Sequence, residues 1–169
     1  MNFYLISFVL IVLDQWSKRY MSSILELCVP GNCQSIELLP VFQFTLLHNR
    51  GAAFSFLDDA GGWQRWFLVS ISCAVSAYIA YWLFQIRRNE KMLAFGLALI
   101  LGGALGNLYD RAFVGYVVDF IVVHWQDSYF PAFNVADSAI TVGAGVLILD
   151  MFLRRNDEPE QAEQETKAE

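Results

Sequence analysis

Four long runs of apolar residues alternate with polar breaks along the chain. Each run approaches the ~20 residues that an α-helix needs to cross a bilayer. No lysine or arginine precedes the first run and no Ala-x-Ala site follows it, so we expect it to stay as a membrane helix rather than be cleaved as a signal peptide. The pattern predicts an all-α polytopic membrane protein with transmembrane helices over about residues 3–21, 66–86, 92–109 and 133–153.

The stretch between the first two runs has a different pattern. Prolines and glycines interrupt residues 22–65, which excludes one long helix there. From Phe42 to Leu46, apolar and polar residues alternate as they do in a half-buried strand. We therefore predict a small β-sheet at the membrane surface. The small residues within 49–54 form either a tight turn or a loop that lines a substrate groove.

Basic residues set the orientation of the predicted helices. The connection 87–91 is short enough for a tight hairpin and carries three basic residues, which places it in the cytoplasm by the positive-inside rule. Both chain termini then lie in the cytoplasm, and the loops 22–65 and 112–132 lie outside it. Arg154 and Arg155, which follow the last run, agree with this orientation.

Composition fits one membrane domain with a polar tail. Of the 169 residues, 56% are hydrophobic, and most of the net charge of −6 comes from residues 156–169, where six acids accompany one lysine. We predict a membrane domain over residues 1–155 and a disordered cytoplasmic tail after it. Within the sequence, no basic patch indicates binding to nucleic acid.

Cysteine and histidine are too sparse to define a metal site. Cys28 and Cys33 lie in a loop expected outside the cytoplasm, where a disulfide is allowed but not required. His48 and His124 are far apart in the sequence, and the spacing of His and Cys is not that of metal ligands. We therefore expect neither a metal nor a cofactor.

Two aspartates lie where an apolar stretch makes a charge expensive to bury. The helix that starts near Lys91 rises about 1.5 Å per residue, which brings Asp110 to the outer interface and Asp119 just past it. Asp137 lies about one turn into the last helix, which enters from the same side. Asp119 and Asp137 can therefore meet, share one proton, and act as general acid and general base on a peptide bond and a water.

Structural explanations compete with this hypothesis. Asp14 and Lys18 are four residues apart, which suits an ion pair that either stabilises the helix or supports a nearby site. Asp110 directly precedes Arg111 and is expected to pair with it. Glycines are expected to serve close helix packing at positions Gly96, Gly102, Gly103, Gly106, Gly143 and Gly145.

Other functions also fit acids in these positions. Asp119 and Asp137 can relay protons or ions in a small carboxylate-based transporter, or they can cap helices, since Asn134 and Asp137 suit a helix start. A non-catalytic assembly factor held together by its glycine faces is a third hypothesis. The clustering of polar residues at one end of the helices favours an enzyme that faces the membrane surface.

Five polar motifs follow one another between Leu13 and about Asp150: Asp14-Gln-x-x-Lys18, Asn49-x-Gly51-Ala52-Ala53-Phe54, Gly102-Gly103-x-x-Gly106-Asn107-x-x-Asp110-Arg111, Val117-Val118-Asp119-Phe120 and Phe133-Asn134-x-Ala136-Asp137-Ser138. In this order they resemble the motifs of lipoprotein signal peptidase, the bacterial signal peptidase II family. The resemblance implies four membrane helices, a small extracytoplasmic β-sheet, and an amphipathic segment over the site in the stretch before Trp66.

The resemblance also implies an activity and a site. The activity is that of an aspartic endopeptidase that cuts the signal peptide from a diacylglyceryl-modified prolipoprotein just before its lipidated cysteine, with Asp119 and Asp137 as the dyad. Further residues are expected to bind substrate or support the site: Asn49, Gly51, Asn107, Arg111, Asn134, Asp110 as the residue that orients Arg111, and Asp14.

The location and partners follow from the same resemblance. The chain is expected in the bacterial inner membrane with its site at the outer face, in contact with membrane lipid and prolipoprotein, and sensitive to the cyclic peptide globomycin. The sequence does not set the oligomeric state, and we expect a monomer.

Overall fold

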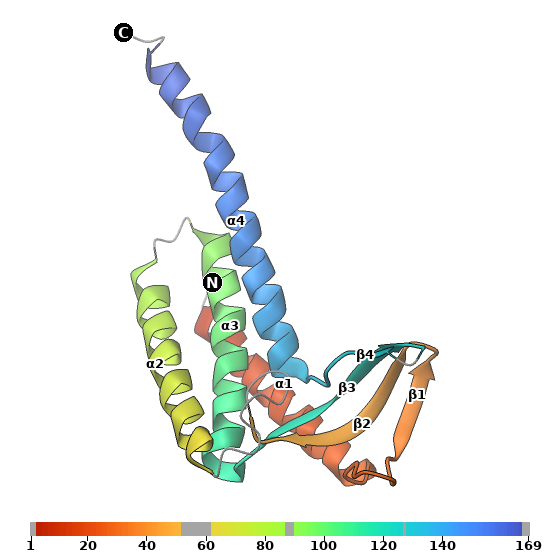
Figure 1. The fold of residues 1–169 in the computed structure, drawn as a ribbon. Helices are drawn as coiled ribbons and strands as arrows, with labels where there is room; N and C mark the ends of the chain where they lie inside the picture. Colours follow the sequence, from red (N-terminus) through yellow and green to blue (C-terminus); the bar gives the residue numbers. More distant parts are fainter. Residues whose placement is uncertain (1–2, 52–61, 87–89, 127, 167–169) are drawn as a thin grey trace.

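The described residues of the chain form four long helices and one small sheet (Figure 1). The structure is a computed structural model that describes residues 3–51, 62–86, 90–126 and 128–166, with the backbone alone for residues 155–166. Within these residues the helices are α1 (Phe3–Ile24), α2 (Trp63–Gln85), α3 (Lys91–Tyr109) and α4 (Val135–Thr166). A π-helical turn, η2 (Asp110–Val114), continues α3 toward the sheet.

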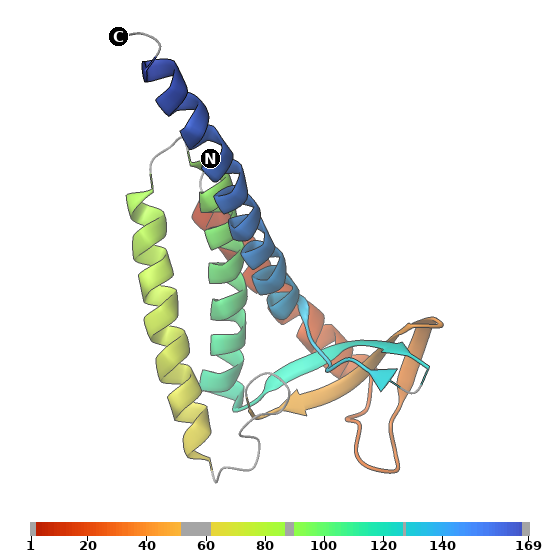
Figure 2. The ribbon, with the colours of Figure 1, turned by 45° about the horizontal axis from the view of Figure 1, so that its top comes forward.

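Helix α3 packs against the three other helices (Figures 1 and 2). Its small residues allow this close approach. A Cβ atom on Gly103 would collide with the backbone carbonyl of Ala136 in α4, and one on Gly143 would lie 2.7 Å from the carbonyl oxygen of Gly96. These glycines therefore serve packing, as predicted. Gly145 does not, because the space beside it is open.

The sheet is antiparallel and has the order β1 (Ser35–Leu39), β2 (Phe42–Asn49), β3 (Val117–Trp125) and β4 (Ser128–Tyr129). It extends from the end of the helices at which α1 ends and α4 begins (Figures 1 and 2). Strand β2 confirms the small sheet predicted from the alternation after Pro40. Its partner β3 pairs Leu47 with Asp119 and Asn49 with Val117, which sets the site residues of both strands side by side.

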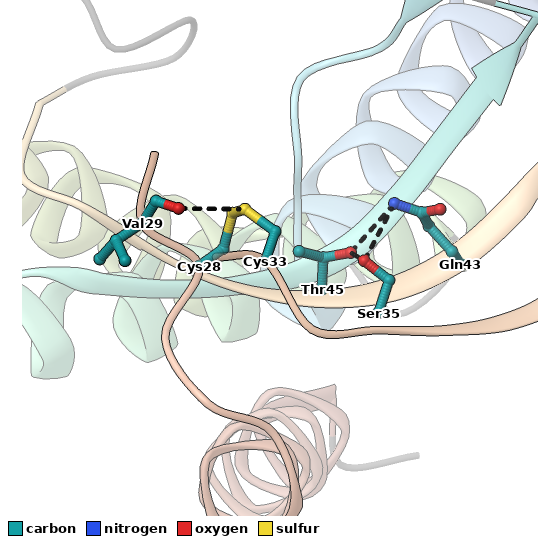
Figure 3. Close-up of a disulfide and its surroundings, with 6 residues drawn as sticks. All are labelled: Cys28, Val29, Cys33, Ser35, Gln43 and Thr45. Carbon is teal, nitrogen blue, oxygen red and sulfur yellow. Dashed lines mark hydrogen bonds between the residues drawn. A yellow bond between two sulfur atoms is a disulfide. The ribbon is translucent and has the colours of Figure 1, made fainter. Parts of the chain in front are cut away.

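A disulfide between Cys28 and Cys33 closes the loop between α1 and β1 (Figure 3). The sequence allowed this disulfide without requiring it, and the structure contains it. Beside it, Ser35 Oγ lies 2.7 Å from Thr45 Oγ1, and Gln43 Nε2 donates to the same Thr45 oxygen at 3.1 Å (Figure 3). The disulfide and these polar side chains line a cavity of about 660 Å³ on the sheet.

Among the described residues, three helices are long and apolar enough to cross a membrane: Trp63–Gln85, Lys91–Val114 and Val135–Arg154. They support the prediction of a membrane protein. The fourth predicted span corresponds to α1, which has 22 residues but contains Asp14, Lys18 and Arg19.

The structure differs from the sequence prediction at the tail. Helix α4 continues to Thr166, so the segment expected to be disordered from Asn156 onward is helical up to that residue. Its glutamate, glutamine and alanine residues have high helix propensity, which a rule based on charge and low hydrophobicity does not weigh. The amphipathic segment expected before Trp66 falls largely on residues 52–61, which lie outside the described part of the chain.

Candidate active site

Asp119 and Asp137 come from different elements and meet around one buried asparagine. Asp119 lies on β3 and Asp137 lies in the first turn of α4. Asn134, which is 0% exposed, lies between them. Its Nδ2 donates to Asp119 Oδ1 at 2.7 Å, and its Oδ1 accepts the N–H of Asp137 at 3.0 Å. The structure thus brings both aspartates to the wall of one cavity.

Backbone pairing and a helix cap hold this arrangement. Phe133 exchanges two backbone hydrogen bonds with Ile121 of β3, at 2.9 and 3.0 Å, so the segment before α4 docks on the strand that carries Asp119. Asn134 then caps α4. Asp137 makes the reciprocal hydrogen bond, in which its Oδ2 accepts the backbone N–H of Asn134 at 3.3 Å. This reciprocal pair is a capping box with aspartate in the place of the usual glutamate, so the same two residues start the helix and form the site.

Two more asparagines donate to the aspartates. Asn107 of α3 donates from Nδ2 to Asp137 Oδ1 at 2.7 Å. Asn49, at the end of β2, donates from Nδ2 to Asp119 Oδ2 at 3.1 Å. The N–H of Gly51 donates to Asn49 Oδ1 at 3.0 Å, which holds the asparagine in place. All three asparagines expected in the site therefore contact the two aspartates.

A buried ion cluster lies behind Asn107. The Nζ of Lys18, a residue that is 2% exposed, lies 2.7 Å from Asp14 Oδ2, 2.7 Å from Asp110 Oδ2 and 3.0 Å from Asn107 Oδ1. Asp14 Oδ1 accepts the N–H of Ala136 at 2.9 Å. Asp14 therefore joins α1 to the first turn of α4, and it supports the site without lining the cavity.

Asp110 does not pair with its neighbour Arg111, contrary to the prediction. Its carboxylate contacts Lys18 and accepts from Gln15 Nε2 at 2.8 Å. Successive residues of a helical turn point in different directions, so Asp110 faces α1 and Arg111 faces the cavity. Arg111 Nη2 instead donates to the carbonyl oxygen of Gly51 at 3.2 Å, which ties η2 to the loop after β2.

Sequence reasoning left one supporting residue open and missed another. The spacing of Lys18 from Asp14 predicted an ion pair that either stabilises the helix or supports a nearby site, and the structure shows it beside the site. Arg65 gave no such signal, because it contacts a segment 46 residues away. Its guanidinium donates to the carbonyl oxygens of Arg111 and Ala112 at 2.7 and 2.8 Å. These are carbonyls at a helix end, which lack partners within the helix.

The cavity has a polar end and an apolar wall. Its volume is about 540 Å³, and the side chains of Asn49, Arg111, Asp119 and Asp137 line its polar end. Most of the rest is apolar and comes from the segment before α4 and from α4: Phe130, Pro131, Ala132, Phe133, Ile140 and Val142, with Val117 of β3 and the hydroxyl residues Ser138 and Thr141 beside them. The cavity can therefore hold an apolar chain along α4 with one polar group beside the two carboxylates.

The environment of Asp119 suits proton transfer near neutral pH. Burial, followed by the negative charge of Asp137, raises the pKa of Asp119 from 3.8 to about 6. Hydrogen bonds from Asn49 and Asn134 and the charge of Lys18 act in the opposite direction. A carboxyl group with a pKa this close to neutral can both donate and accept a proton, which is what acid–base catalysis requires.

Comparison with known proteins identifies the family. Residues 6–153 match the family model described as Signal peptidase (SPase) II. The chain is 49% identical to the lipoprotein signal peptidase of Alteromonas mediterranea, over 99% of this chain and 90% of that protein. It is 56% identical to the lipoprotein signal peptidase of Pseudomonas fluorescens, over 87% of this chain and 85% of that protein.

A solved structure described as a bacterial membrane enzyme has the same fold. The TM-score is 0.79 at 27% identity, and the match covers 92% of this chain and 90% of that one. The family match spans the residues that line the cavity, from Asn49 to Val142, and Asp14 behind it. The resemblance seen in the five motifs is therefore confirmed, and the chain belongs to the signal peptidase II family of lipoprotein-processing membrane peptidases.

Proposed function

We propose that Asp119 and Asp137 are the catalytic dyad of this signal peptidase and hydrolyse the peptide bond through an activated water. The observation that carries the proposal is that one buried asparagine, Asn134, contacts both carboxylates at one cavity: its Nδ2 donates to Asp119 Oδ1 and its backbone N–H donates to Asp137 Oδ2. Two carboxyl groups placed together in this way share a proton, because two adjacent negative charges are costly away from water.

Each aspartate accepts two hydrogen bonds, and the helix dipole at Asp137 and the burial of Asp119 favour one distribution of the shared proton. Asp137 accepts from the Asn107 amide and from the N–H of Asn134, at the N-terminus of α4, where the helix dipole favours a negative charge. We therefore place the negative charge on Asp137. The proton is on Asp119, whose burial favours the neutral form.

This distribution gives each aspartate one role in the reaction. Asp137 takes a proton from water as the water oxygen attacks the carbonyl carbon of the scissile bond, and Asp119 gives its proton to the carbonyl oxygen. When the tetrahedral intermediate breaks down, Asp137 passes its proton to the leaving nitrogen and Asp119 recovers a proton from the hydroxyl. Both groups then have their starting charge. Arg111, Asn49 and Gly51 are placed to hold the substrate backbone at the polar end.

The apolar wall fits a signal peptide that remains in the membrane. It runs along α4, one of the helices long and apolar enough to cross a bilayer. The proposed substrate is a diacylglyceryl-modified prolipoprotein, cut just before its lipidated cysteine. Its apolar segment would lie along the wall at Ile140 and Val142 while its acyl chains stay in lipid.

We also propose that α1 is the fourth membrane span. Its charged residues Asp14 and Lys18 are buried against the other helices, whereas Phe8, Val12 and Trp16 are exposed on its outer side. A helix that buries its charges and exposes aromatic and aliphatic side chains suits a lipid environment. With four spans, both termini lie in the cytoplasm, and the dyad of a monomeric enzyme lies at the outer face of the bacterial inner membrane.

Cleavage of a defined substrate tests this function. Purified protein in lipid is incubated with a diacylglyceryl-modified prolipoprotein and, separately, with the same chain left unmodified. We expect cleavage of the lipidated chain alone, blocked by globomycin, with a product that begins at the modified cysteine by mass spectrometry. Equal cleavage of both chains, or a product with another first residue, would contradict the proposed substrate. Ion flux in proteoliposomes without cleavage would favour the transporter hypothesis.

A further inference from the structure

The asparagine amides around the dyad cannot turn over freely. A backbone N–H can only donate a hydrogen bond, so it must face the oxygen of an amide and not its NH2 group. The N–H of Asp137 faces Asn134 Oδ1, and the N–H of Gly51 faces Asn49 Oδ1. Each contact fixes its amide so that Nδ2 points at Asp119.

The third amide, that of Asn107, is fixed by a side chain instead. Its Oδ1 accepts from Lys18 Nζ at 3.0 Å, and an ammonium group, like a backbone N–H, can only donate. Its Nδ2 must then face away from Lys18, toward Asp137 Oδ1 at 2.7 Å. Asn134 Nδ2 also donates to Asn107 Oδ1, at the longer distance of 3.3 Å, so Lys18 of α1 and Asn134 together set the direction of the hydrogen bond to Asp137.

We propose that Lys18 is a positioning residue of the catalytic site, which keeps the Asn107 amide turned so that its NH2 group always donates to Asp137. This inference rests on the proposed dyad and adds a residue to it. Lys18 does not line the cavity beside the dyad and touches neither aspartate of the pair, so its hydrogen-bond connection to Asp137 runs through Asn107.

The ion cluster holds Lys18 in the position that this role requires. Its ammonium has three protons, and three oxygens lie at hydrogen-bond distance: Asp14 Oδ2, Asp110 Oδ2 and Asn107 Oδ1. Asp14 Oδ2 and Asn107 Oδ1 accept hydrogen bonds from the ammonium, whereas Asp110 Oδ2 holds it as an ion-pair partner without a hydrogen bond. Burial strengthens these contacts, because an unpaired donor inside the protein is costly.

The orientation of the amide decides where the dyad proton resides. If the amide turned over, Asn107 Oδ1 would face Asp137 Oδ1. Two hydrogen-bond acceptors repel each other at this distance unless one of them is protonated, so Asp137 would have to carry the proton. The base would then be neutral and the roles of the two aspartates would be disturbed. Lys18 therefore keeps Asp137 in the ionised form that the proposed mechanism needs.

Several charged groups surround Asp137, and a test must separate their direct effects from an effect through Asn107. They are Asp119 on β3, Asp110 and Arg111 on η2, and Asp14 and Lys18 on α1. Because Asp14, Lys18 and Asp110 together carry one net negative charge, Lys18→Met made together with Asp14→Asn removes the ammonium donor and leaves that net charge unchanged. The change at residue 14 keeps an oxygen for the N–H of Ala136.

The pH profile of cleavage by this double variant is the main readout. We expect kcat to fall at least about tenfold, KM to change less than about twofold, and the profile to move to higher pH by about one unit, as expected for the loss of one oriented hydrogen bond to a carboxylate. Lys18→Arg, which keeps a donor, is expected to retain the wild-type profile. A uniform loss of activity with an unshifted profile would show a structural role and overturn the proposal.

A second background tests whether the effect passes through Asn107. In Asn107→Ala, the changes at residues 14 and 18 are expected to cause no further shift of the profile. A shift of the same size in this background would show a direct charge effect and overturn the proposal. If the double variant does not fold, Asn107→Leu leaves the ion cluster in place and must itself shift the profile upward; a wild-type profile would overturn the inference.

The proposed dyad is tested separately in the same assay. Activity in Asp137→Asn would overturn the dyad and the inference that rests on it. An inactive Asp137→Asn combined with an unshifted profile in the Lys18 variants would overturn the role of Lys18 alone.

Discussion

Asn134 has two physical roles that belong to different parts of its side chain. Its Oδ1 accepts the N–H of Asp137 and so caps α4, whereas its Nδ2 donates to Asp119 at 2.7 Å. The first contact stabilises the helix and the second orients a carboxylate. Because the two atoms can be removed separately, stability and activity can be separated at this residue.

We expect Asn134→Ser to retain the stability of the wild type and to lose activity. A serine oxygen caps a helix about as well as asparagine, but Asp119 loses its amide donor, for which we expect about a hundredfold lower kcat. Asn134→Ala, the matched control, loses the cap as well and should unfold more easily by about 1 kcal/mol. Thermal unfolding in detergent and cleavage kinetics measure both effects; wild-type kcat in Asn134→Ser would contradict the role of Nδ2.

The titration of Asp119 is a second measurement at the residue scale. Its pKa is raised from 3.8 to about 6 by burial and then by the charge of Asp137. We expect the carboxyl carbon of Asp119 to titrate near pH 6 by NMR and at lower pH in Asp137→Asn, where the neighbouring charge is gone. A wild-type midpoint near 4, or one that Asp137→Asn does not lower, would contradict this description.

The raised pKa of Asp119 also determines how its contribution to folding stability changes with pH. Because the pKa of Asp119 is higher in the folded protein, the folded state binds more protons than the unfolded state between about pH 4 and pH 6. The contribution of Asp119 to stability is therefore present below about pH 4 and decreases as the pH rises through about 6. Its ionisation opposes folding.

At the scale of elements, the contact between α3 and α4 positions half of the dyad. Gly103 of α3 faces the backbone of Ala136, the residue before Asp137. Any side chain at position 103 must move the first turn of α4, which carries both Asn134 and Asp137. Close helix packing therefore sets the geometry of the site as well as the stability of the fold.

We expect Gly103→Ala to lower both stability and activity, because its Cβ would collide with the Ala136 carbonyl. Overpacking of this kind costs about 1–3 kcal/mol. Gly145→Ala is the matched control on α4: open space lies beside it, and alanine favours a helix by up to about 1 kcal/mol over glycine. Unfolding temperatures in detergent compare the two, and equal temperatures would contradict the packing role of Gly103.

The elements differ in how far the sequence could predict them. The apolar runs predicted membrane helices, and the alternation near Phe44 predicted β2. Strand β3 was not predicted, because Val117, Val118, Asp119 and Phe120 are all buried, and a strand covered on both faces has no alternating pattern. Tertiary pairing across β2 and the segment before α4 makes this stretch a strand.

The site residues also divide into those that the sequence could predict and those that it could not. The motifs and the depth of the residues placed Asp119, Asp137 and the asparagines together, since polar residues in apolar segments are visible in a sequence. The predicted pairing of Asp110 with Arg111 was wrong, because adjacency in the sequence does not determine which neighbour a side chain faces. Lys18 of α1 reaches the Asp110 carboxylate because the helices pack together, and local sequence patterns carry no information on that packing.

At the scale of the molecule, polar side chains gather at one end of the helices. The ion cluster and the dyad lie where α1 ends and α4 begins, whereas Glu90, Asp150 and Arg154 pair at the opposite end. Between these ends the buried core around Leu97 and Leu101 is apolar. This distribution fits a peptidase that works at a membrane surface better than a carboxylate relay across the membrane.

A charge placed on the outer side of α1 tests whether this helix spans the membrane. Val12 is 49% exposed, and we expect Val12→Arg to impair insertion, because an arginine at the centre of a span costs about 2.5–3.5 kcal/mol. Ser23→Arg, near the end of α1, is the control that should insert normally. The fraction of each variant that resists alkaline extraction from membranes measures insertion. Normal insertion of Val12→Arg would contradict a fourth span at α1.

The most direct test of the central claim is the single-turnover rate of cleavage in variants of the dyad. Asp119→Asn and Asp137→Asn are compared with the wild type and with Asp150→Asn, which makes the same substitution midway along α4, where Asp150 pairs with Arg154 away from the cavity. We expect each dyad variant to be inserted and folded but slower by at least about a hundredfold, the size of a lost general acid or base, and Asp150→Asn to cleave normally. A folded Asp119→Asn or Asp137→Asn that cleaves lipidated prolipoprotein at the wild-type rate would contradict the account.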